Sequence, residues 1–199
     1  MRLTLYLTPS TESVPFDHQH VLMGVLHRWL GPDNPYHDDT SFYGFGMLRG
    51  GRVQRGRLTF PEGARWDVGF YEEDGAQRLT AGVLSRPEVA SGMRVHHIAP
   101  APEPAFTNPH RFRAAAPILV RRRVDGRRRY LLWDDPEADA VLTDTFRRRL
   151  AAAGLTGRDL EAMVRFDRSY AGARSKLVRI RRAAHRGSLC PVWLYGTPA

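Results

Sequence analysis

The first half of the chain alternates between two hydrophobic patterns. Two segments with apolar residues three and four positions apart predict amphipathic helices, at 17–30 and 76–85. Segments in which apolar and polar residues alternate predict strands at 2–8, 41–48, 64–72 and 92–98. The resulting order, strand–helix–strand–strand–helix–strand, is that of a ferredoxin-like domain.

The helix predicted over 17–30 has clear ends and two distinct faces. Asp17 is a suitable N-cap, and Gly31-Pro32 ends the segment. The helix geometry puts His27 about 150° from the centre of the apolar stripe, beside His20 on the opposite face. We therefore do not expect His27 to be a core histidine. The stripe itself consists of Val21, Leu22, Val25, Leu26, Trp29 and Leu30.

The second half repeats part of this order. Two strands, 115–123 and 127–133, flank Asp125-Gly126, a favoured pair for a two-residue hairpin turn. A helix over 135–152 follows, with Asp135 as its cap and Gly154 as its stop signal. Three further strands are predicted, at 164–170, 176–182 and 189–195. The pattern predicts an α+β protein with tandem ferredoxin-like (RRM-like) domains, the second lacking its closing helix and strand.

A proline-rich stretch separates the two halves. Residues 99–109, APAPEPAFTNP, hold four prolines, which cannot continue a helix or a central strand. We therefore expect an N-terminal domain over 1–98, a linker over 99–110 and an incomplete C-terminal domain over 111–199.

Composition excludes several classes of protein. The single Cys among 199 residues rules out a disulfide framework and a cysteine-based zinc site. The apolar runs are far shorter than the roughly 20 residues that span a bilayer, and the N-terminus lacks the features of a signal peptide. We expect a cytoplasmic protein that does not bind membranes.

Positive charge is concentrated in the second half. The net charge is +9, yet residues 1–99 hold 10 Arg and 11 acidic residues, whereas residues 100–199 hold 20 basic and 10 acidic residues. Clustered arginine neutralises phosphates and releases their counterions, so a polyanionic partner is expected there. A genomic bias toward Arg codons explains Arg in place of Lys, but it does not explain the difference between the halves.

The sequence offers acid–base groups rather than a metal or cofactor site. No HExxH, GxSxG or Walker motif is present, and we expect neither a metal nor a cofactor. His27 and His37 titrate near neutrality and are a suitable acid–base pair for metal-free RNA cleavage. Arg28, Arg49 or Arg52 is a candidate for stabilising charge on the phosphate. The alternative is that His27 and His37 are both ordinary surface histidines. The lone Cys190 is expected to be a small core residue.

Three basic segments of the second half are candidate RNA contacts. They lie just after the linker, around the hairpin turn and along a late strand, where alternation puts Arg179 and Arg181 opposite Val178 and Ile180. A sheet with an apolar face and an arginine face is suited to binding RNA. The candidate residues are Arg111, Arg113, Arg121, Arg123, Lys176, Arg179 and Arg181, with Arg28 and Arg52 from the first half.

Several stretches together resemble a known family. The chain is similar to the CRISPR-associated endoribonucleases of the Cas6 type, members of the repeat-associated RNA-binding RAMP superfamily. The likeness covers most of the chain and depends on the order of its pieces. They are MRLTLYLTP, VPFDHQHVLMGVLHRWLG, YHDDTSFYGFGMLRGG followed by LTFPEGARWDVGFY, GMRVHHIAPAPEPAFTNPHRFRAAAPILVRRR, and LCPVWLYG.

The resemblance implies a specific activity. Such enzymes cut precursor CRISPR RNA within its repeats without a metal, leaving a 2′,3′-cyclic phosphate and a 5′-OH. His37 matches the family's catalytic His in the loop after the first helix, and His27 matches an assisting residue near the end of that helix. Where the family often has a phosphate-stabilising Lys, this chain has Ser41, so Arg28, Arg49 or Arg52 would take that role; of these we name Arg49 as the candidate catalytic cation.

The resemblance also leaves an alternative open. The chain is either such an endoribonuclease or a non-catalytic RNA-binding RAMP-type module, for example a subunit of a CRISPR effector complex. The expected partners are CRISPR repeat RNA, other effector subunits and a second copy of the chain in a homodimer. The family's C-terminal helix, glycine-rich loop and strand have no counterpart before the sequence ends at Ala199.

Overall fold

A computed structural model describes residues 1–34, 41–180 and 183–197 of the chain. These residues divide into two compact units. Unit 1 spans Met1–Glu103 and unit 2 spans Pro104–Ala199. Each unit has its own sheet and its own hydrophobic core, and each is described by itself.

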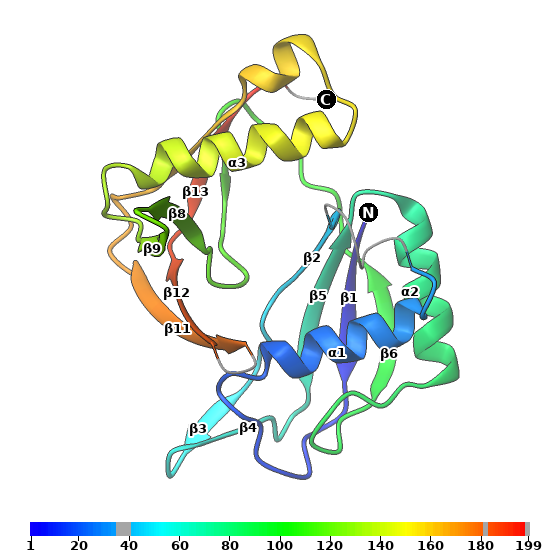
Figure 1. The fold of residues 1–199 in the computed structure, drawn as a ribbon. Helices are drawn as coiled ribbons and strands as arrows, with labels where there is room; N and C mark the ends of the chain where they lie inside the picture. The colour runs from blue at the N-terminus through cyan, green and yellow to red at the C-terminus, as the bar shows by residue number, and fades with distance from the viewer. Residues whose placement is uncertain (35–40, 181–182, 198–199) are drawn as a thin grey trace. The chain divides into compact units, whose positions relative to one another are not determined.

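Unit 1 contains a four-stranded sheet, two helices and a small hairpin (Figure 1). The sheet strands are β1 (Arg2–Leu7), β2 (Tyr43–Phe45), β5 (Ala64–Phe70) and β6 (Val95–Pro100). The helices are α1 (Gln19–Leu30) and α2 (Glu73–Ser85), and the hairpin consists of β3 (Arg52–Gln54) and β4 (Arg57–Thr59).

The sheet of unit 1 has the strand order β2–β5–β1–β6, with every pair antiparallel. Both helices lie on the same face of the sheet (Figure 1). This order and the βαββαβ succession confirm the ferredoxin-like arrangement predicted for the first half. The β3–β4 hairpin was not predicted, because the residues of β3 are all exposed and show no alternation.

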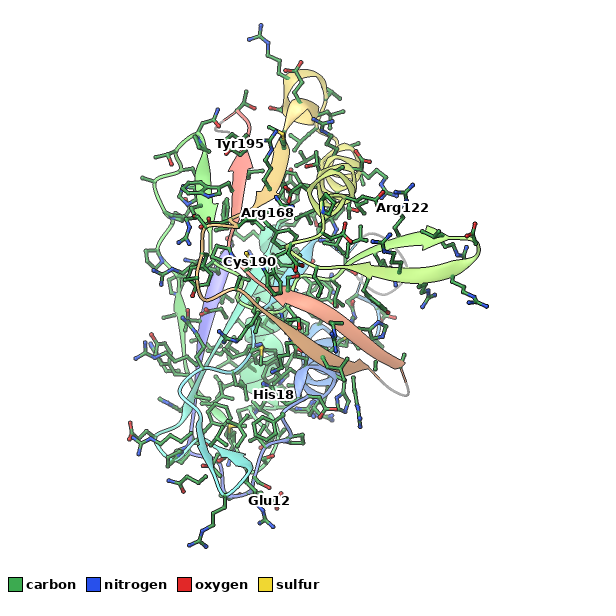
Figure 2. All side chains as sticks on the ribbon, turned by 90° about the vertical axis from the view of Figure 1, so that its left-hand side faces the viewer. Glu12, His18, Arg122, Arg168, Cys190 and Tyr195 are labelled. Carbon is green, nitrogen blue, oxygen red and sulfur yellow. The ribbon has the colours of Figure 1, made fainter. Side chains whose placement is uncertain are left out.

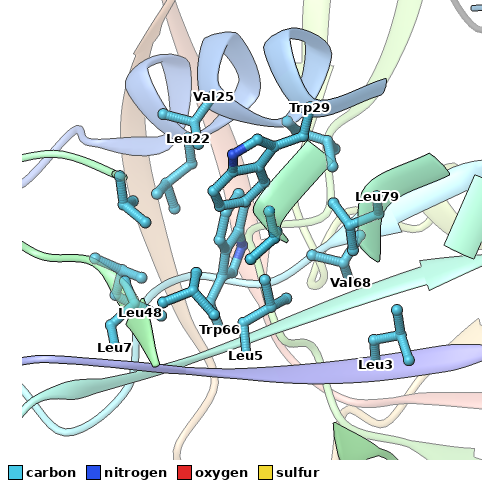
Figure 3. Close-up of a cluster of buried hydrophobic side chains, with 14 of the residues drawn as sticks. Leu3, Leu5, Leu7, Leu22, Val25, Trp29, Leu48, Trp66, Val68 and Leu79 are labelled. Atoms are coloured by element: carbon cyan, nitrogen blue, oxygen red, sulfur yellow. The ribbon is translucent and has the colours of Figure 1, made fainter. Parts of the chain in front are cut away.

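The core of unit 1 lies between the sheet and its helices (Figure 3). Leu3, Leu5 and Leu7 point from alternate positions of β1 toward the helices, and each is at most 4% exposed. Trp29 of α1 packs on Trp66 of β5, with ring centroids 5.7 Å apart. Five of the six residues in the predicted apolar stripe of α1 are buried, and Val21 is half-buried; the buried residues are Leu22, Val25, Leu26, Trp29 and Leu30.

The two helices of unit 1 approach closely at Gly82. A Cβ at that position would lie 2.2 Å from the carbonyl oxygen of Trp29. Any larger side chain would force the backbones of α1 and α2 apart, so glycine is required there. This contact fixes where α1 lies over the sheet.

Unit 2 has a three-stranded sheet, one long helix and two hairpins (Figure 1). The sheet strands are β7 (His110–Phe112), β10 (Met163–Phe166) and β13 (Val192–Tyr195). The helix α3 (Ala138–Ala152) precedes a short 3₁₀ helix, Gly157–Glu161. The hairpins are β8 (Val120–Val124) with β9 (Arg127–Leu131), and β11 (Arg174–Ile180) with β12 (Ala183–Leu189).

The sheet of unit 2 has the antiparallel order β10–β13–β7. In chain order, β7, α3, β10 and β13 correspond to the first strand, first helix and next two strands of unit 1's ferredoxin-like sheet. Unit 1 has a strand, β6, beside β1, whereas none of the strands described in unit 2 occupies the matching place beside β7.

Some predicted element ends differ from the structure. The strand predicted over 189–195 is shorter in the structure and corresponds to β13, whereas β12 was not predicted; Pro191, which has no N–H for the ladder, lies between them. No side-chain hydrogen bond caps α1, so the cap predicted at Asp17 is wrong. The Asp135 carboxylate does accept the N–H of Glu137, at 2.9 Å, just before α3 begins. The predicted linker contains the end of β6 and the start of β7.

Candidate active site

A histidine–tyrosine pair lies at the end of α1 in unit 1. The Nε2 atom of His27 is hydrogen-bonded to the hydroxyl of Tyr43, at 2.9 Å, and the two rings meet edge to face with centroids 5.8 Å apart. His27 is half-buried, in agreement with the prediction that it is not a core histidine. Burial raises the pKa of Tyr43, so its side chain remains a neutral phenol at physiological pH.

The sequence did not identify Tyr43. Tyr43 pairs with Phe70 of β5, whose side chain is buried on the face that the helices cover. Directly opposed residues of an antiparallel pair share a face, so the Tyr43 ring is on the same face as α1. The alternation in 41–48 contained this signal, because it puts Tyr43 and Phe45 on one side of the strand.

The second predicted catalytic histidine, His37, lies outside the described residues. Its proposed pairing with His27 therefore remains a prediction from the sequence. Of the predicted pair, the described residues establish only the place of His27 and its contact with Tyr43.

The three candidate phosphate-binding arginines of unit 1 already have protein partners. Arg28 donates to the carbonyl oxygen of Glu88, and Arg52 pairs with the carboxylate of Glu62. Arg49 pairs with Asp67 at 2.6 Å. These arginines are exposed, so RNA phosphates would compete with these partners.

The sheet separates Arg49 from His27. Asp67 lies between Trp66 and Val68 on β5, and both neighbours are buried on the helix-covered face. Alternation therefore puts Asp67, and the Arg49 guanidinium bound to it, on the helix-free face. His27 belongs to α1 on the other face, so the structure does not bring the predicted catalytic residue Arg49 to His27.

The helix-free face of unit 1 has an arginine and a histidine on either side of a central aromatic ring. Tyr6 of β1 is paired with Arg65 of β5 and with His97 of β6. The Arg65 guanidinium lies 5.7 Å from the centroid of the Tyr6 ring, and the His97 ring lies 5.4 Å from it. A pocket of about 420 Å³ adjoins this row, lined by Tyr6, Leu7, Arg49, Gly50, Glu62, Gly63, Ala64, Arg65 and His96.

The β8–β9 hairpin of unit 2 holds six arginines, and Figure 2 shows it projecting from that unit. Arg122 and Arg129, opposite each other in the register, pair with Glu137 and Asp135 beside the start of α3. The alternate positions carry Arg121, Arg123 and Arg128. In the part of the chain that the structure describes, these three form no ion pair, so their charge is available to a ligand.

A second histidine–tyrosine pair joins the two hairpins of unit 2. The hydroxyl of Tyr130, on β9, is hydrogen-bonded to Nδ1 of His185, on β12, at 2.7 Å. The ring centroids are 5.8 Å apart and the rings are nearly perpendicular. Tyr130 lies on the same hairpin face as Arg121, so the pair holds β12 next to the unpaired arginines.

The helix-free face of unit 2 has an aromatic ring between two cations. Trp193, on the central strand β13, is paired with Arg165 of β10 and Arg111 of β7. Arg165 also lies over the ring of Tyr195, at 5.9 Å. Both units therefore present an aromatic ring with an arginine beside it, an arrangement suited to stacked bases and phosphates.

The remaining predicted RNA contacts are on the β11–β12 hairpin and after β7. Arg179 is exposed and alternates with the buried Val178, as predicted. Lys176 is half-buried, and Arg113 is exposed. Arg181 lies outside the described residues.

The structure gives no support for other kinds of site. Among the described residues, no cluster of three or more His, Cys, Asp or Glu side chains is arranged to hold a metal ion. No helix in the described ranges is both long and apolar enough to cross a membrane. Cys190 is fully buried, and burial raises the pKa of its thiol, so the prediction of a core residue is confirmed.

Comparison with known proteins finds matches in structure but not in sequence. No protein-family model matches the chain, and no curated protein matches it. A Cas6-related protein of Pyrococcus furiosus superposes with a TM-score of 0.85 at 17% identity, over 99% of this chain and 87% of that one. A RAMP protein described as binding different RNA substrates gives 0.78 at 18% identity, over 99% and 88%. A Cas6 product complex gives 0.65 at 15% identity, over 99% and 85%.

These matches confirm, at the level of fold, the resemblance drawn from the sequence. The chain has the α+β fold of Cas6 and Cas6-related RAMP proteins over nearly its whole length.

Proposed function

We propose that this protein is a metal-independent endoribonuclease that cleaves precursor CRISPR RNA within its repeats. The products are a 2′,3′-cyclic phosphate and a 5′-OH end. The observation that carries the proposal is the Cas6 fold over 99% of the chain, shared with a Cas6 product complex. The basic character of unit 2 supports it, because RNA is the polyanion on which such enzymes act.

The chemistry requires two proton transfers. The 2′-OH loses a proton to a base as its oxygen attacks the phosphorus, and the bond from phosphorus to O5′ breaks as an acid protonates O5′. We assign these two roles to His37 and His27. Tyr43 is a positioning residue, since its hydrogen bond to Nε2 fixes the orientation of the His27 ring.

Arg49 has a different role in this proposal. Because its guanidinium is on the helix-free face, it is placed to bind an RNA strand rather than to stabilise charge beside His27. The same binding role is assigned to the other basic residues predicted from the sequence. They are Arg28, Arg52, Arg111, Arg113, Arg121, Arg123, Lys176, Arg179 and Arg181.

The proposal includes the biological setting. Unit 1 is the catalytic ferredoxin-like domain and unit 2 the basic RNA-binding domain, acting in the cytoplasm where precursor CRISPR RNA is made. CRISPR repeat RNA is the substrate. Other effector subunits and a second copy of the chain are proposed as protein partners.

The test is cleavage of the host's own repeat RNA in EDTA, followed by analysis of the product ends. Under single-turnover conditions, His37→Ala is expected to slow cleavage by about 10²- to 10⁴-fold, because one proton-transfer group is lost. His20→Ala is the matched control, since His20 is exposed and lies on α1 away from Tyr43. Unchanged cleavage by His37→Ala would contradict the catalytic assignment.

A non-cleaving RNA-binding module is the second candidate. A RAMP protein of the same fold is described as binding different RNA substrates, which favours keeping this alternative. Such a module would bind repeat RNA with a salt slope of about −0.7 for each neutralised phosphate and leave the strand intact. Intact RNA in the EDTA assay would support this alternative.

A further inference from the structure

A pocket in unit 2 combines positive charge with an exposed aromatic ring. Its volume is about 330 Å³. Residues far apart in the sequence meet there, from β7, the loop before β11, β11 itself and the connection between β12 and β13. The lining residues are Arg111, Arg113, Ala114, Tyr170, Arg174, Leu189, Cys190 and Pro191.

One side of the pocket is fixed by an ion pair between the partly exposed Arg111 and the buried Asp167. The Nε and Nη2 atoms of Arg111 contact Oδ2 of Asp167 at 2.8 and 2.7 Å. The other oxygen, Oδ1, accepts the hydroxyl of Ser169 at 2.5 Å. Asp167 is only 6% exposed, and these bonds lower the pKa of its carboxyl group. The acid is thereby held ionised against Arg111 rather than facing a ligand.

The Tyr170 ring is held in place but remains accessible. The Arg111 guanidinium lies 5.5 Å from its centroid, in a cation–π contact. The ring also lies against Gly172, where an added Cβ would be 2.7 Å from the Tyr170 hydroxyl. Tyr170 is still 41% exposed, so part of the ring is open to a stacking partner.

Two cations of the pocket have no acidic partner. Arg113 and Arg174 are both exposed, and neither forms an ion pair within the ranges that the structure describes. Arg174 makes one long hydrogen bond, 3.5 Å, to the carbonyl oxygen of Gly172. Among the described residues that line the pocket none is acidic, so the electrostatic potential there favours an anion.

We propose that this pocket binds one nucleotide of a single-stranded segment of the RNA, with its base stacked on Tyr170 and its phosphate held by Arg113 and Arg174. The inference rests on the proposed function, and it assigns Tyr170 and Arg174 a role that the sequence did not suggest. The assignment depends on finding arginines and an exposed tyrosine in one pocket. The planar guanidinium group of arginine binds phosphate through paired hydrogen bonds, and the face of a tyrosine ring stacks on any base. The volume lies at the lower end of the range for ligand pockets, which suits one nucleotide.

The experiment measures the affinity for a fluorescent single-stranded oligouridylate by anisotropy, in EDTA and over a series of salt concentrations. Tyr170→Ala is expected to weaken binding about 10-fold, because it removes the stacking surface. Tyr170→Phe keeps the ring and is expected to bind like the parent. Arg113→Gln and Arg174→Gln are each expected to make the salt slope shallower by about 0.7.

A matched control separates the pocket from overall charge. Arg158 is an exposed arginine of the 3₁₀ helix in the same unit, outside the pocket. Arg158→Gln is expected to leave both affinity and slope unchanged. Thermal unfolding of each variant checks that unit 2 remains folded.

The outcomes distinguish this inference from the proposed function. If the pocket variants bind like the parent while repeat RNA is still cleaved, the pocket assignment is overturned and the enzyme assignment stands. If the parent binds no RNA, both are overturned. Competition with uridine monophosphate tests whether the ligand is RNA or a free nucleotide. If the free nucleotide binds tightly and the affinity for RNA does not depend on Tyr170, the pocket is a mononucleotide site and the proposal is overturned.

Discussion

Units 1 and 2 each contain a histidine–tyrosine pair of nearly the same geometry. In both, the ring centroids are 5.8 Å apart and the rings are almost perpendicular, with hydrogen bonds of 2.9 and 2.7 Å. The surroundings differ. His27 and Tyr43 lie beside the buried core of unit 1, whereas His185 and Tyr130 join two arginine-rich hairpins.

The contact itself therefore does not define a catalytic site. In unit 1 the pair joins a helix to a sheet strand that the core holds rigidly, which suits a group that must be oriented for proton transfer. In unit 2 the same contact holds two hairpins together and thereby groups unpaired arginines. We therefore assign chemistry to the first pair and the support of a binding surface to the second.

The two units also differ in core and charge. Among the residues that the structure describes, the hydrophobic cluster of unit 1 contains 21 buried residues and that of unit 2 contains five. Unit 1 has 10 basic and 12 acidic residues, whereas unit 2 has 20 basic and 9 acidic residues. Self-repulsion among like charges opposes compaction, so unit 2 is expected to be the less stable unit and the one that RNA stabilises more.

Replacing His27 and His185 is expected to give the largest difference between the two units. His27→Ala is expected to slow single-turnover cleavage by about 10²- to 10⁴-fold, because a proton-transfer group is removed. His185→Ala is expected to change the rate at saturating RNA by less than about 3-fold, since no chemistry is assigned to it. Equal losses in both variants would show that the two pairs do not differ in the way we infer.

Two tryptophans test the difference in core. Trp66→Ala is expected to lower the free energy of unfolding of unit 1 by about 3–5 kcal/mol, because the side chain is fully buried. Trp193→Ala is expected to cost about 1 kcal/mol in unit 2, since Trp193 lies half-buried on the helix-free face. Urea unfolding, with hydrogen exchange to separate the units, gives both values. A larger loss of unfolding free energy for Trp193→Ala than for Trp66→Ala would contradict the inferred difference between the two cores.

Acid unfolding is the smallest test and concerns unit 2 alone. Hydrogen bonds from Ser169 and Arg111 lower the pKa of Asp167. A lowered pKa adds stability at neutral pH, and that stability is lost as the pH falls below about 4. Asp167→Asn is therefore expected to be less stable than the parent at pH 7 and to show a shallower further loss in acid. Thermal unfolding between pH 7 and pH 3 measures the effect, and parallel curves would contradict it.

Much of the fold could be predicted from local patterns. Alternation located β1 and β5, and the apolar stripe located α1, because one buried face leaves a periodic trace in the sequence. The patterns failed where that trace is absent. The β3–β4 hairpin is largely exposed, and β7 has only three residues beside a proline-rich stretch.

The candidate site was predictable only in part. His27 was found because helix geometry alone puts it outside the stripe. Its partner Tyr43 was not found, since the pairing depends on β2 joining the sheet next to β5. The same pairing of strands puts the Arg49 guanidinium on the opposite face, which the spacing of residues could not reveal.

The ferredoxin-like order of unit 1 and the excess of arginine in the second half follow from the amino-acid sequence, because periodicity and composition are properties of the chain. Which arginines are neutralised depends on the folded structure. Arg111 and the buried Asp167 are 56 positions apart and form an ion pair, while the neighbouring Arg113 and Arg174 keep their charge for a ligand. The physical reason is that electrostatic attraction depends on distance in space, and strand pairing sets that distance.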